Sequence, residues 1–263
     1  AVNALAFDVN AACSGFLFAL NTADAYLRTG LVENALIIGS EVLSKLVDWT
    51  DRSSCILFGD GAGAVVVERC RTESRAVEYG NTLSETEKGM QNTTAEEKRI
   101  PAGILGRALH SDGTGGGVLQ CGARELTTPY AGTSVAKTDQ NQTTDGREHY
   151  IQMDGQEVYR FATRRVPQCI EEALSDAGLD VPDIDMFVLH QANARIIDAV
   201  AKRLHADRKK FPTNLERVGN LSSASIPVLL DELHRQRKLH RGDRIVLAGF
   251  GAGLTIGACV MTW

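Results

Sequence analysis

The sequence predicts a layered α/β protein, because its apolar runs alternate between strand and helix patterns and occur in two similar blocks. In the first block, residues 5–9 form a short apolar run suited to a buried strand. Residues 16–27 then repeat apolar side chains at helical spacing and stop at Gly30, a common helix terminator. Apolar strands follow at 35–39 and 62–68. Strand, helix and strand in this order are typical of a layered α/β domain.

A second block repeats this alternation further along the chain. Its predicted elements are a helix over 158–177 ended near Gly178, a strand over 185–191, helices over 194–204 and from 226 to 233, and strands over 244–248 and 254–261. Between the blocks, residues 69–101 are polar and lack apolar periodicity, which predicts an insertion or linker. Residues 113–147 also have a loop-like composition.

The two blocks share a local pattern. A glycine-rich turn over 59–63 leads into one strand, and a similar turn over 249–253 leads into another. Each turn lies downstream of a stretch of small residues that opens a helix, at 11–15 and 221–225. Glycine turns are common, so this pattern alone is weak support for a duplication.

Composition sets limits on function. The 263 residues carry a net charge of −5, with 43% hydrophobic and 23% charged residues, as in an ordinary globular protein. This charge argues against a general nucleic-acid binder, and no apolar run reaches the roughly 18 residues of a membrane span. The six cysteines lack paired spacing, which favours reduced thiols in the cytoplasm over a disulfide framework or a metal site. No secretory signal is found.

Cys13 is the first candidate for chemistry. It lies where the predicted strand gives way to a helix, between small neighbours that leave the sulfur accessible. The helix dipole and free N–H groups there favour an anion, so we expect the pKa of the thiol to be lowered. A buried cysteine in a tight turn explains the same local sequence equally well.

Two further polar residues follow apolar or small-residue stretches. His190 ends a hydrophobic strand, and strand ends are where α/β proteins gather their sites. A lone histidine there is more often a capping or solvent-facing residue. Asn220 stands between a glycine and a run of small hydroxyl residues, where a helix cap or a turn is the commoner role.

The combination of these segments is more specific than any one of them. In chain order they read Ala-Cys-Ser-Gly, Phe-Gly-Asp-Gly-Ala-Gly-Ala, His-Gln-Ala-Asn, Gly-Asn-Leu-Ser-Ser-Ala-Ser and Gly-Phe-Gly-Ala-Gly-Leu-Thr. This order resembles the β-ketoacyl-ACP synthase III family over most of the chain. The resemblance implies a thiolase-like, duplicated αβαβα fold, with residues 1–68 in the N-terminal half and 102–263 in the C-terminal half. It also implies a homodimer.

The resemblance implies a Cys-His-Asn triad at Cys13, His190 and Asn220. Cys13 would take the acyl group from an acyl-CoA primer, with the backbone N–H groups of Cys13 and Ala252 as the oxyanion hole. Malonyl-ACP (acyl carrier protein) would then lose carbon dioxide, and His190 and Asn220 would stabilise the enolate that attacks the acyl-enzyme. The product is a 3-ketoacyl-ACP. CoA and the phosphopantetheine of ACP enter as parts of substrates, and no metal or redox cofactor is expected.

Other positions match substrate contacts of the family. The expected acyl, CoA and pantetheine contacts are Phe58, Arg52, Met153, Gly155, Asn193, Gly251 and Gly253. The expected ACP-docking residues are Arg160, Arg195, Lys202 and Arg203. A core phenylalanine, a surface arginine and a solvated basic helix face give the same patterns without any substrate.

The family has a further stretch before its cysteine-bearing strand, whereas only twelve residues precede Cys13 here. We therefore expect an incomplete N-terminal half that is inactive alone, or completed by a separate chain. Two alternatives to fatty-acid initiation stay open at this point. One is a related condensing acyltransferase of secondary metabolism, and the other is a partner-dependent thiolase-fold subunit.

Overall fold

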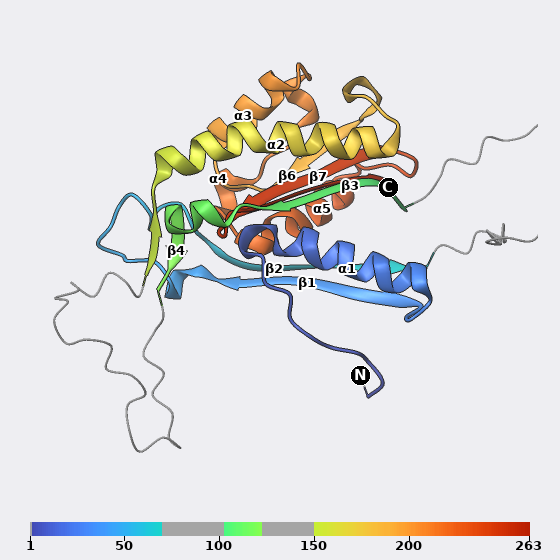
Figure 1. Ribbon diagram of the computed structural model, residues 1–263, viewed down its shortest axis with the longest axis horizontal. Helices are drawn as coiled ribbons and strands as arrows, with labels where there is room; N and C mark the ends of the chain where they lie inside the picture. Colours follow the sequence, from blue (N-terminus) through green and yellow to red (C-terminus); the bar gives the residue numbers. More distant parts are fainter. Residues whose placement is uncertain (1, 70–102, 123–149) are drawn as a thin grey trace, which may run out of the picture.

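The fold consists of stacked layers of helices and sheets. A computed structural model of the chain describes residues 2–69, 103–122 and 150–263. In Figure 1, α2 (Gly155–Ala177) and α3 (Ala194–Arg203) form an outer layer over a four-stranded sheet. On the other face of that sheet lie α1 (Gly15–Thr29) and α5 (Ser225–Arg235), which also contact a second, two-stranded sheet. The predicted layered α/β fold is confirmed.

The four-stranded sheet is the centre of the molecule. Its strand order is β3-β8-β7-β6, with β6 parallel to β7 and the other neighbours antiparallel. The strands are β3 (Gly103–Ser111), β6 (Met186–Leu189), β7 (Arg244–Gly251) and β8 (Thr255–Thr262). All residues of β7 after Arg244 are buried. Helices cover both faces of this sheet, which explains why its strands read as continuous apolar runs.

Apolar side chains fill the space on each face of this sheet. Towards α2 and α3, Phe187 of β6 is fully buried, and its ring stacks on that of Phe211 with centroids 4.6 Å apart. Towards α1 and α5, Leu17, Ile226 and Leu247 pack in one cluster. Burying each such side chain stabilises the fold by about 1.5–3 kcal/mol. The sheet is thus held from both sides.

The helix ends follow local sequence signals. Gly30 ends α1 and Gly178 ends α2, both in the left-handed conformation that glycine adopts without strain. Asp154 begins α2, where its carboxylate accepts hydrogen bonds from the N–H groups of Gln156 (3.0 Å) and Glu157 (3.1 Å). The predicted ends at Gly30 and Gly178 are therefore confirmed.

The two-stranded sheet pairs β1 (Asn34–Val42) with β2 (Asp60–Glu68) in antiparallel register. Its inner face packs on α1 and α5, and Ile37 there is 5% exposed. Its outer face carries Leu36 at 61%, Ile38 at 60% and Val66 at 72% exposure. Within the described residues this outer face is uncovered. The predicted glycine turn over 249–253 is confirmed, since it contains the connection between β7 and β8. The one predicted over 59–63 is wrong, because residues 60–63 lie within β2 and pair with the end of β1.

One prediction for the first block is wrong, and another lies outside the described residues. Residues 5–9 are not a buried strand: they pair with no strand among the described residues, and Leu5 and Phe7 are 63% and 54% exposed. An apolar run forms a strand only where a neighbour accepts its backbone hydrogen bonds. The predicted insertion at 69–101 lies outside the described residues apart from Arg69, so the domain boundaries stay a prediction.

Three strands were not predicted from the sequence, namely β3 and the short antiparallel pair β4 (Leu119–Cys121) and β5 (Ile151–Met153). One short helix, α4 (Leu215–Val218), was also not predicted. None of the described helices is long and apolar enough to cross a membrane.

Candidate active site

Cys13 lies in a tight turn directly before α1. It is the middle residue of the 3-10 turn η1 (Ala12–Ser14), which Ala12 opens with a φ of 46°. The end of β7 reaches this turn so closely that a Cβ on Gly251 would be 2.6 Å from the Cys13 nitrogen. Only glycine tolerates that approach. The second half of the chain therefore forms one wall of the cysteine turn.

A pair of hydroxyl groups ties the cysteine turn to the start of β8. The hydroxyl oxygens of Ser14 and Thr255 lie 2.6 Å apart, and Thr255 donates to the carbonyl of Ala11 over 3.0 Å. Ser14 is fully buried. These contacts hold the Cys13 backbone beside the turn that contains Ala252, as the predicted oxyanion hole needs. Neither hydroxyl was predicted as part of the site, although Ser14 and Thr255 both lie within the motifs named above.

The expectation of a lowered pKa for Cys13 is wrong. Burial raises the pKa of the Cys13 thiol to about 11, because a thiolate loses its hydration there. A hydrogen bond from the Ser222 side chain and the backbone N–H of Cys13 lower the pKa, but less than burial raises it. The negative charge of Glu41 raises it further. Cys13 is thus a protonated thiol in the resting protein.

His190 follows β6 and is almost fully enclosed. It is 4% exposed, and its backbone N–H donates to the Ala248 carbonyl over 2.8 Å. Its ring meets Phe250 edge-on with centroids 5.7 Å apart, and its Nδ1 has no hydrogen-bond partner among the described residues. Burial lowers the pKa of His190 to about 4. The imidazole is therefore neutral near pH 7 and carries one N–H that can donate.

Asn220 is held by backbone contacts to the loop before β2. Its N–H donates to the Leu57 carbonyl (2.8 Å), its carbonyl accepts from Gly59 (3.0 Å), and it forms a parallel bridge with Phe58. The side-chain Oδ1 accepts the N–H of Ser222 over 2.8 Å. Because Oδ1 is engaged, the NH₂ group is the end of the amide left for a ligand.

The end of β7 brings these three residues together. Gly249 and Gly251 lie on the same face of β7, since side-chain positions alternate along a strand. A Cβ on Gly249 would lie 3.0 Å from the His190 Cβ, and the Gly251 position meets Cys13. Asn220 joins them through Ser222, which bonds both to the Asn220 amide and to the Cys13 thiol. A nucleophile and two donors thus converge from separate segments.

The predicted substrate contacts occupy varied surroundings. Phe58 is partly buried beside Asn220, and Met153 packs against the core at the end of β5. Asn193 caps α3, and its Oδ1 accepts the Arg195 N–H over 2.8 Å. Gly251 is buried, Ala252 is partly buried, and the remaining three are exposed: Arg52, Gly155 and Gly253. Their contacts with substrate stay predictions.

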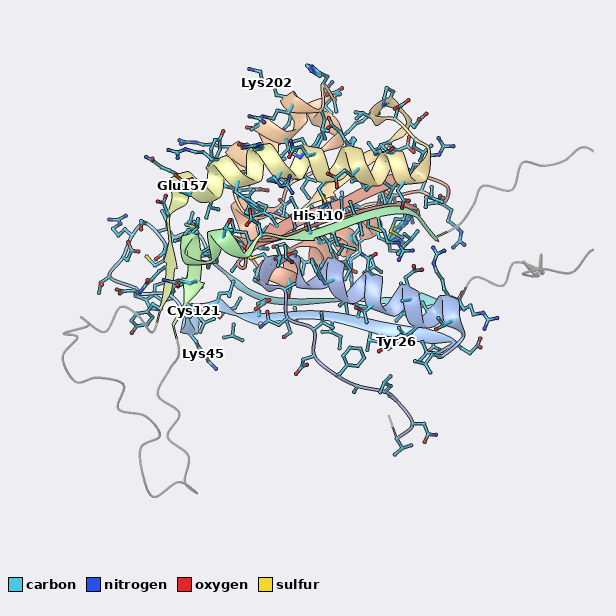
Figure 2. The ribbon with its side chains drawn as sticks, in the orientation of Figure 1. Tyr26, Lys45, His110, Cys121, Glu157 and Lys202 are labelled. Carbon is cyan, nitrogen blue, oxygen red and sulfur yellow. The ribbon has the colours of Figure 1, made fainter. Side chains whose placement is uncertain are left out.

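The predicted ACP-docking residues all lie on the surface. Arg195, Lys202 and Arg203 are exposed on α3, whose other side is buried, and Figure 2 labels Lys202 on this outer helix. Arg160 of α2 pairs with Glu157, which offsets its charge. None of the ion pairs between described residues involves the three cations of α3. The basic face on α3 is therefore free of internal salt bridges in the described chain.

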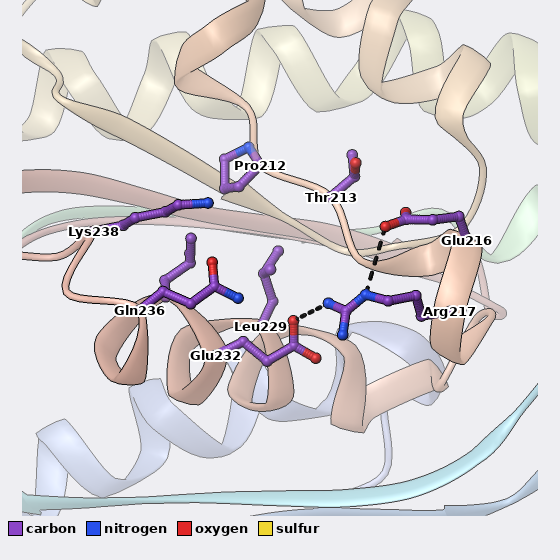
Figure 3. A pocket seen from close by; sticks show the side chains of 9 residues that line it. Pro212, Thr213, Glu216, Arg217, Leu229, Glu232, Gln236 and Lys238 are labelled. Carbon is purple, nitrogen blue, oxygen red and sulfur yellow. Dashed lines mark hydrogen bonds and ion pairs between the residues drawn. The ribbon is translucent and has the colours of Figure 1, made fainter.

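A surface groove of about 320 Å³ lies elsewhere, between α4 and α5. Figure 3 shows Arg217 in this groove between the carboxylates of Glu216 and Glu232. None of the three candidate catalytic residues lines it. The groove is therefore separate from the candidate active site.

The duplicated layers, with a cysteine before one helix and a histidine and an asparagine beside it, define a thiolase-fold condensing enzyme. Two family models match the chain: 3-oxoacyl-[acyl-carrier-protein] synthase III over residues 7–82, and its C-terminal part over residues 174–263. A β-ketoacyl-[acyl-carrier-protein] synthase III of Acaryochloris marina is 43% identical over 263 residues, which is 100% of this chain and 68% of that protein.

Solved structures agree with these matches. A 3-oxoacyl-[acyl-carrier-protein] synthase III of Aquifex aeolicus superposes with a TM-score of 0.77 at 33% identity, covering 99% of this chain and 68% of the other. The priming β-ketosynthase of the R1128 polyketide biosynthetic pathway superposes with a TM-score of 0.77 at 32% identity, covering 99% and 66%. The chain belongs to the β-ketoacyl-ACP synthase III family. It is thus an acyltransferase of the condensing type.

Proposed function

We propose that this protein joins an acyl-CoA primer to malonyl-ACP by decarboxylative Claisen condensation, giving the 3-ketoacyl-ACP that starts fatty-acid synthesis. The observation that carries the assignment of roles is the convergence of Cys13, His190 and Asn220 at the end of β7. Family membership supports the reaction, and the local chemistry supports each role.

In the first half-reaction, the Cys13 sulfur attacks the thioester carbonyl of the acyl-CoA. Because the pKa of the thiol is about 11, its proton must leave as the C–S bond forms, and the departing CoA sulfur is its final acceptor. The backbone N–H groups of Cys13 and Ala252 face the developing oxyanion. The tetrahedral intermediate then expels CoA, which takes up the proton and leaves as the free thiol.

In the second half-reaction, the malonyl group loses carbon dioxide, and its electron pair becomes an enolate. The N–H of neutral His190 and the Asn220 amide donate hydrogen bonds to the enolate oxygen. A pKa of about 4 suits His190 to this donor role, because it keeps the imidazole neutral near pH 7. The N–H of a neutral ring can donate a hydrogen bond without giving up its proton. The enolate carbon attacks the acyl thioester, the Cys13 sulfur leaves as a thiolate and takes up a proton from solvent, and 3-ketoacyl-ACP is released.

The exposed cations of α3 support a docking role for Arg195, Lys202 and Arg203 towards the acidic carrier protein. Two finer assignments belong to the same proposal. The protein acts as a homodimer, and the exposed apolar face of β1–β2 is the kind of surface that a partner covers. It works in the cytoplasm, which the scattered spacing of the six cysteines in the sequence favours, and it uses no metal or redox cofactor.

A second candidate is the priming of a polyketide pathway. The likeness to the R1128 priming β-ketosynthase favours it, since that structure has the same TM-score as the synthase III of Aquifex aeolicus. Both candidates share the Cys13 chemistry and differ in primer and carrier protein. A subunit that needs a further chain for activity is the third possibility, and it is distinguished by turnover of the chain alone.

Intact-mass spectrometry tests the proposal. The protein is incubated with acetyl-CoA and with longer acyl-CoAs, and then with malonyl-ACP. A stoichiometric acyl adduct that is absent in Cys13→Ser and is discharged by malonyl-ACP is the expected result, and the best primer separates the first two candidates. Absence of any adduct from a folded chain would argue against independent activity and favour a partner-dependent subunit.

A further inference from the structure

Glu41 connects the two halves of the molecule next to the candidate active site. It lies near the end of β1, and its Oε1 accepts two hydrogen bonds from Ser223, from the hydroxyl over 2.6 Å and from the N–H over 3.2 Å. Ser223 lies in the 3-10 turn η7 (Ser222–Ala224), 182 residues further along the chain. A carboxylate from the first block therefore holds a turn from the second.

The strand and the turn also meet through their backbones. A Cβ on Gly39 would lie 2.7 Å from the Ser223 carbonyl oxygen, so only glycine allows β1 to approach η7 this closely. Glu41 stands two residues further along, on the same face of β1 as Gly39. The close packing of β1 on η7 thus fixes the contact between Glu41 and Ser223.

The turn held by Glu41 also contacts the reacting groups. Ser222 donates its N–H to Oδ1 of Asn220 over 2.8 Å, and its side chain bonds to the Cys13 thiol. Ser222 has a φ of 48°, in the left-handed region that is strained for a side-chain-bearing residue. Such a conformation persists only where neighbouring contacts hold it. The two hydrogen bonds between Ser223, the next residue, and Glu41 are contacts of this kind.

The turn η7, which Glu41 holds through Ser223, is the equivalent in the second block of the cysteine turn η1. Ala12 and Ser222 open η1 and η7 with φ values of 46° and 48°, so Cys13 and Ser223 are the middle residues of equivalent turns. The turns face each other, since a Cβ on Gly15 would lie 3.6 Å from the Ser223 Cβ. Where the first turn presents a thiol for reaction, the second has a hydroxyl engaged by a carboxylate.

We infer that Glu41 is a positioning residue of the condensing reaction, whose carboxylate fixes through Ser223 the turn that presents Ser222 and Asn220 to the reacting groups. The inference rests on the proposed function. Glu41 touches no reacting atom in this role. Its charge has a separate effect, since it raises the pKa of the Cys13 thiol.

The other titratable groups around Cys13 are few in the described chain. The elements packed against η1 are α1, β7, β8 and η7. Their titratable residues are Asp24, Tyr26 and Arg28 in the second half of α1, Arg244 at the start of β7, and Cys259 within β8. His190, after β6, is neutral. A change in the titration of Cys13 on removing the Glu41 charge is therefore assigned to that charge.

Two substitutions separate anchoring from charge. Glu41→Gln keeps an oxygen that accepts from Ser223 and removes the charge, whereas Glu41→Ala removes both. Because misplacing a catalytic group by about 1 Å can cost 10²-fold, we expect Glu41→Ala to lower kcat for condensation by about 10–100-fold. Glu41→Gln should restore kcat to within about threefold of the wild type, and KM for acyl-CoA should stay unchanged in both.

A second readout does not depend on turnover. The rate of Cys13 alkylation by iodoacetamide is measured against pH and followed by peptide mass mapping, with Glu68→Gln as the control. Glu68 is an exposed carboxylate at the end of β2, in the same sheet. We expect Glu41→Gln to move the alkylation profile to lower pH and Glu68→Gln to leave it in place.

Two outcomes would overturn the inference: equal losses of kcat in Glu41→Gln and Glu41→Ala, or full activity in Glu41→Ala. If Glu41→Ala does not fold by circular dichroism, Ser223→Ala takes its place, because it removes only the hydroxyl and should lower kcat in the same sense. Full activity in a folded Ser223→Ala would then overturn the inference. A wild type that forms no acyl adduct would instead overturn the proposed function.

Discussion

Replacement of Asn220 tests the division of labour between the two half-reactions. In Asn220→Asp, the carboxylate still accepts the Ser222 N–H that Oδ1 accepts over 2.8 Å, but the NH₂ donor to the enolate is gone. Loss of one preorganised donor costs about 10²–10³ in kcat, or about 2.7–4 kcal/mol. We expect decarboxylation of malonyl-ACP to fall by at least this factor. Acylation of Cys13 should persist, because its oxyanion hole uses other donors.

The two steps are measured separately, by intact mass for acylation and by release of carbon dioxide from malonyl-ACP for decarboxylation. Asn220→Ala also leaves the Ser222 N–H unpaired, which lowers the free energy of unfolding by about 1–3 kcal/mol. Asn34→Ala, at an exposed position at the start of β1, is the matched control. Equal loss of both steps in Asn220→Asp would refute the assignment of the amide to the enolate.

Two further predictions concern His190 and Gly251. The pKa of His190 is lowered from 6.5 to about 4, so between these values the unfolded chain binds more protons than the folded one. Stability is therefore lost as the pH is lowered from about 6.5, by roughly 3 kcal/mol at about pH 4. Urea unfolding at pH 7 and pH 4.5 should show a smaller decrease for His190→Gln, and an equal decrease would contradict the shift. In Gly251→Ala, the new Cβ lies 2.6 Å from the Cys13 nitrogen and must displace the turn. We expect about 1–3 kcal/mol less stability and loss of acylation, whereas Gly117→Ala, with open space around it, should change neither; an acylating Gly251→Ala would be the contrary result.

Elements with local signals could be predicted from the sequence. The helices ended by Gly30 and Gly178 and the apolar strands β1 and β7 follow from periodicity and glycine caps. Strand β3 was missed because glycines and Arg107 interrupt its apolar pattern. Gly106 is required there by a contact distant in sequence, since its Cβ would lie 2.3 Å from the Ala173 carbonyl oxygen. Such a contact leaves no local signal.

The candidate site also has parts with a local sequence signal and parts that depend on contacts distant in sequence. Cys13, His190 and Asn220 were predicted through motif order, and the structure brings them together at the end of β7. The direction of the Cys13 pKa shift was wrong, because the helix dipole is visible in the sequence whereas burial by β7 is not. Glu41 was missed for a similar reason, since its partner Ser223 lies in the other half. The three candidate catalytic residues could thus be predicted from motif order, whereas the contacts proposed to position them depend on residues far apart in the chain.

The contact between Ser14 and Thr255 spans 241 residues and has a consequence for how the thiol behaves over the lifetime of the chain. Until β7 and β8 dock, Cys13 is an ordinary cysteine in open water, with a larger thiolate fraction than in the native state. Nascent or thermally unfolded molecules are therefore more open to oxidation and alkylation at this residue than folded ones.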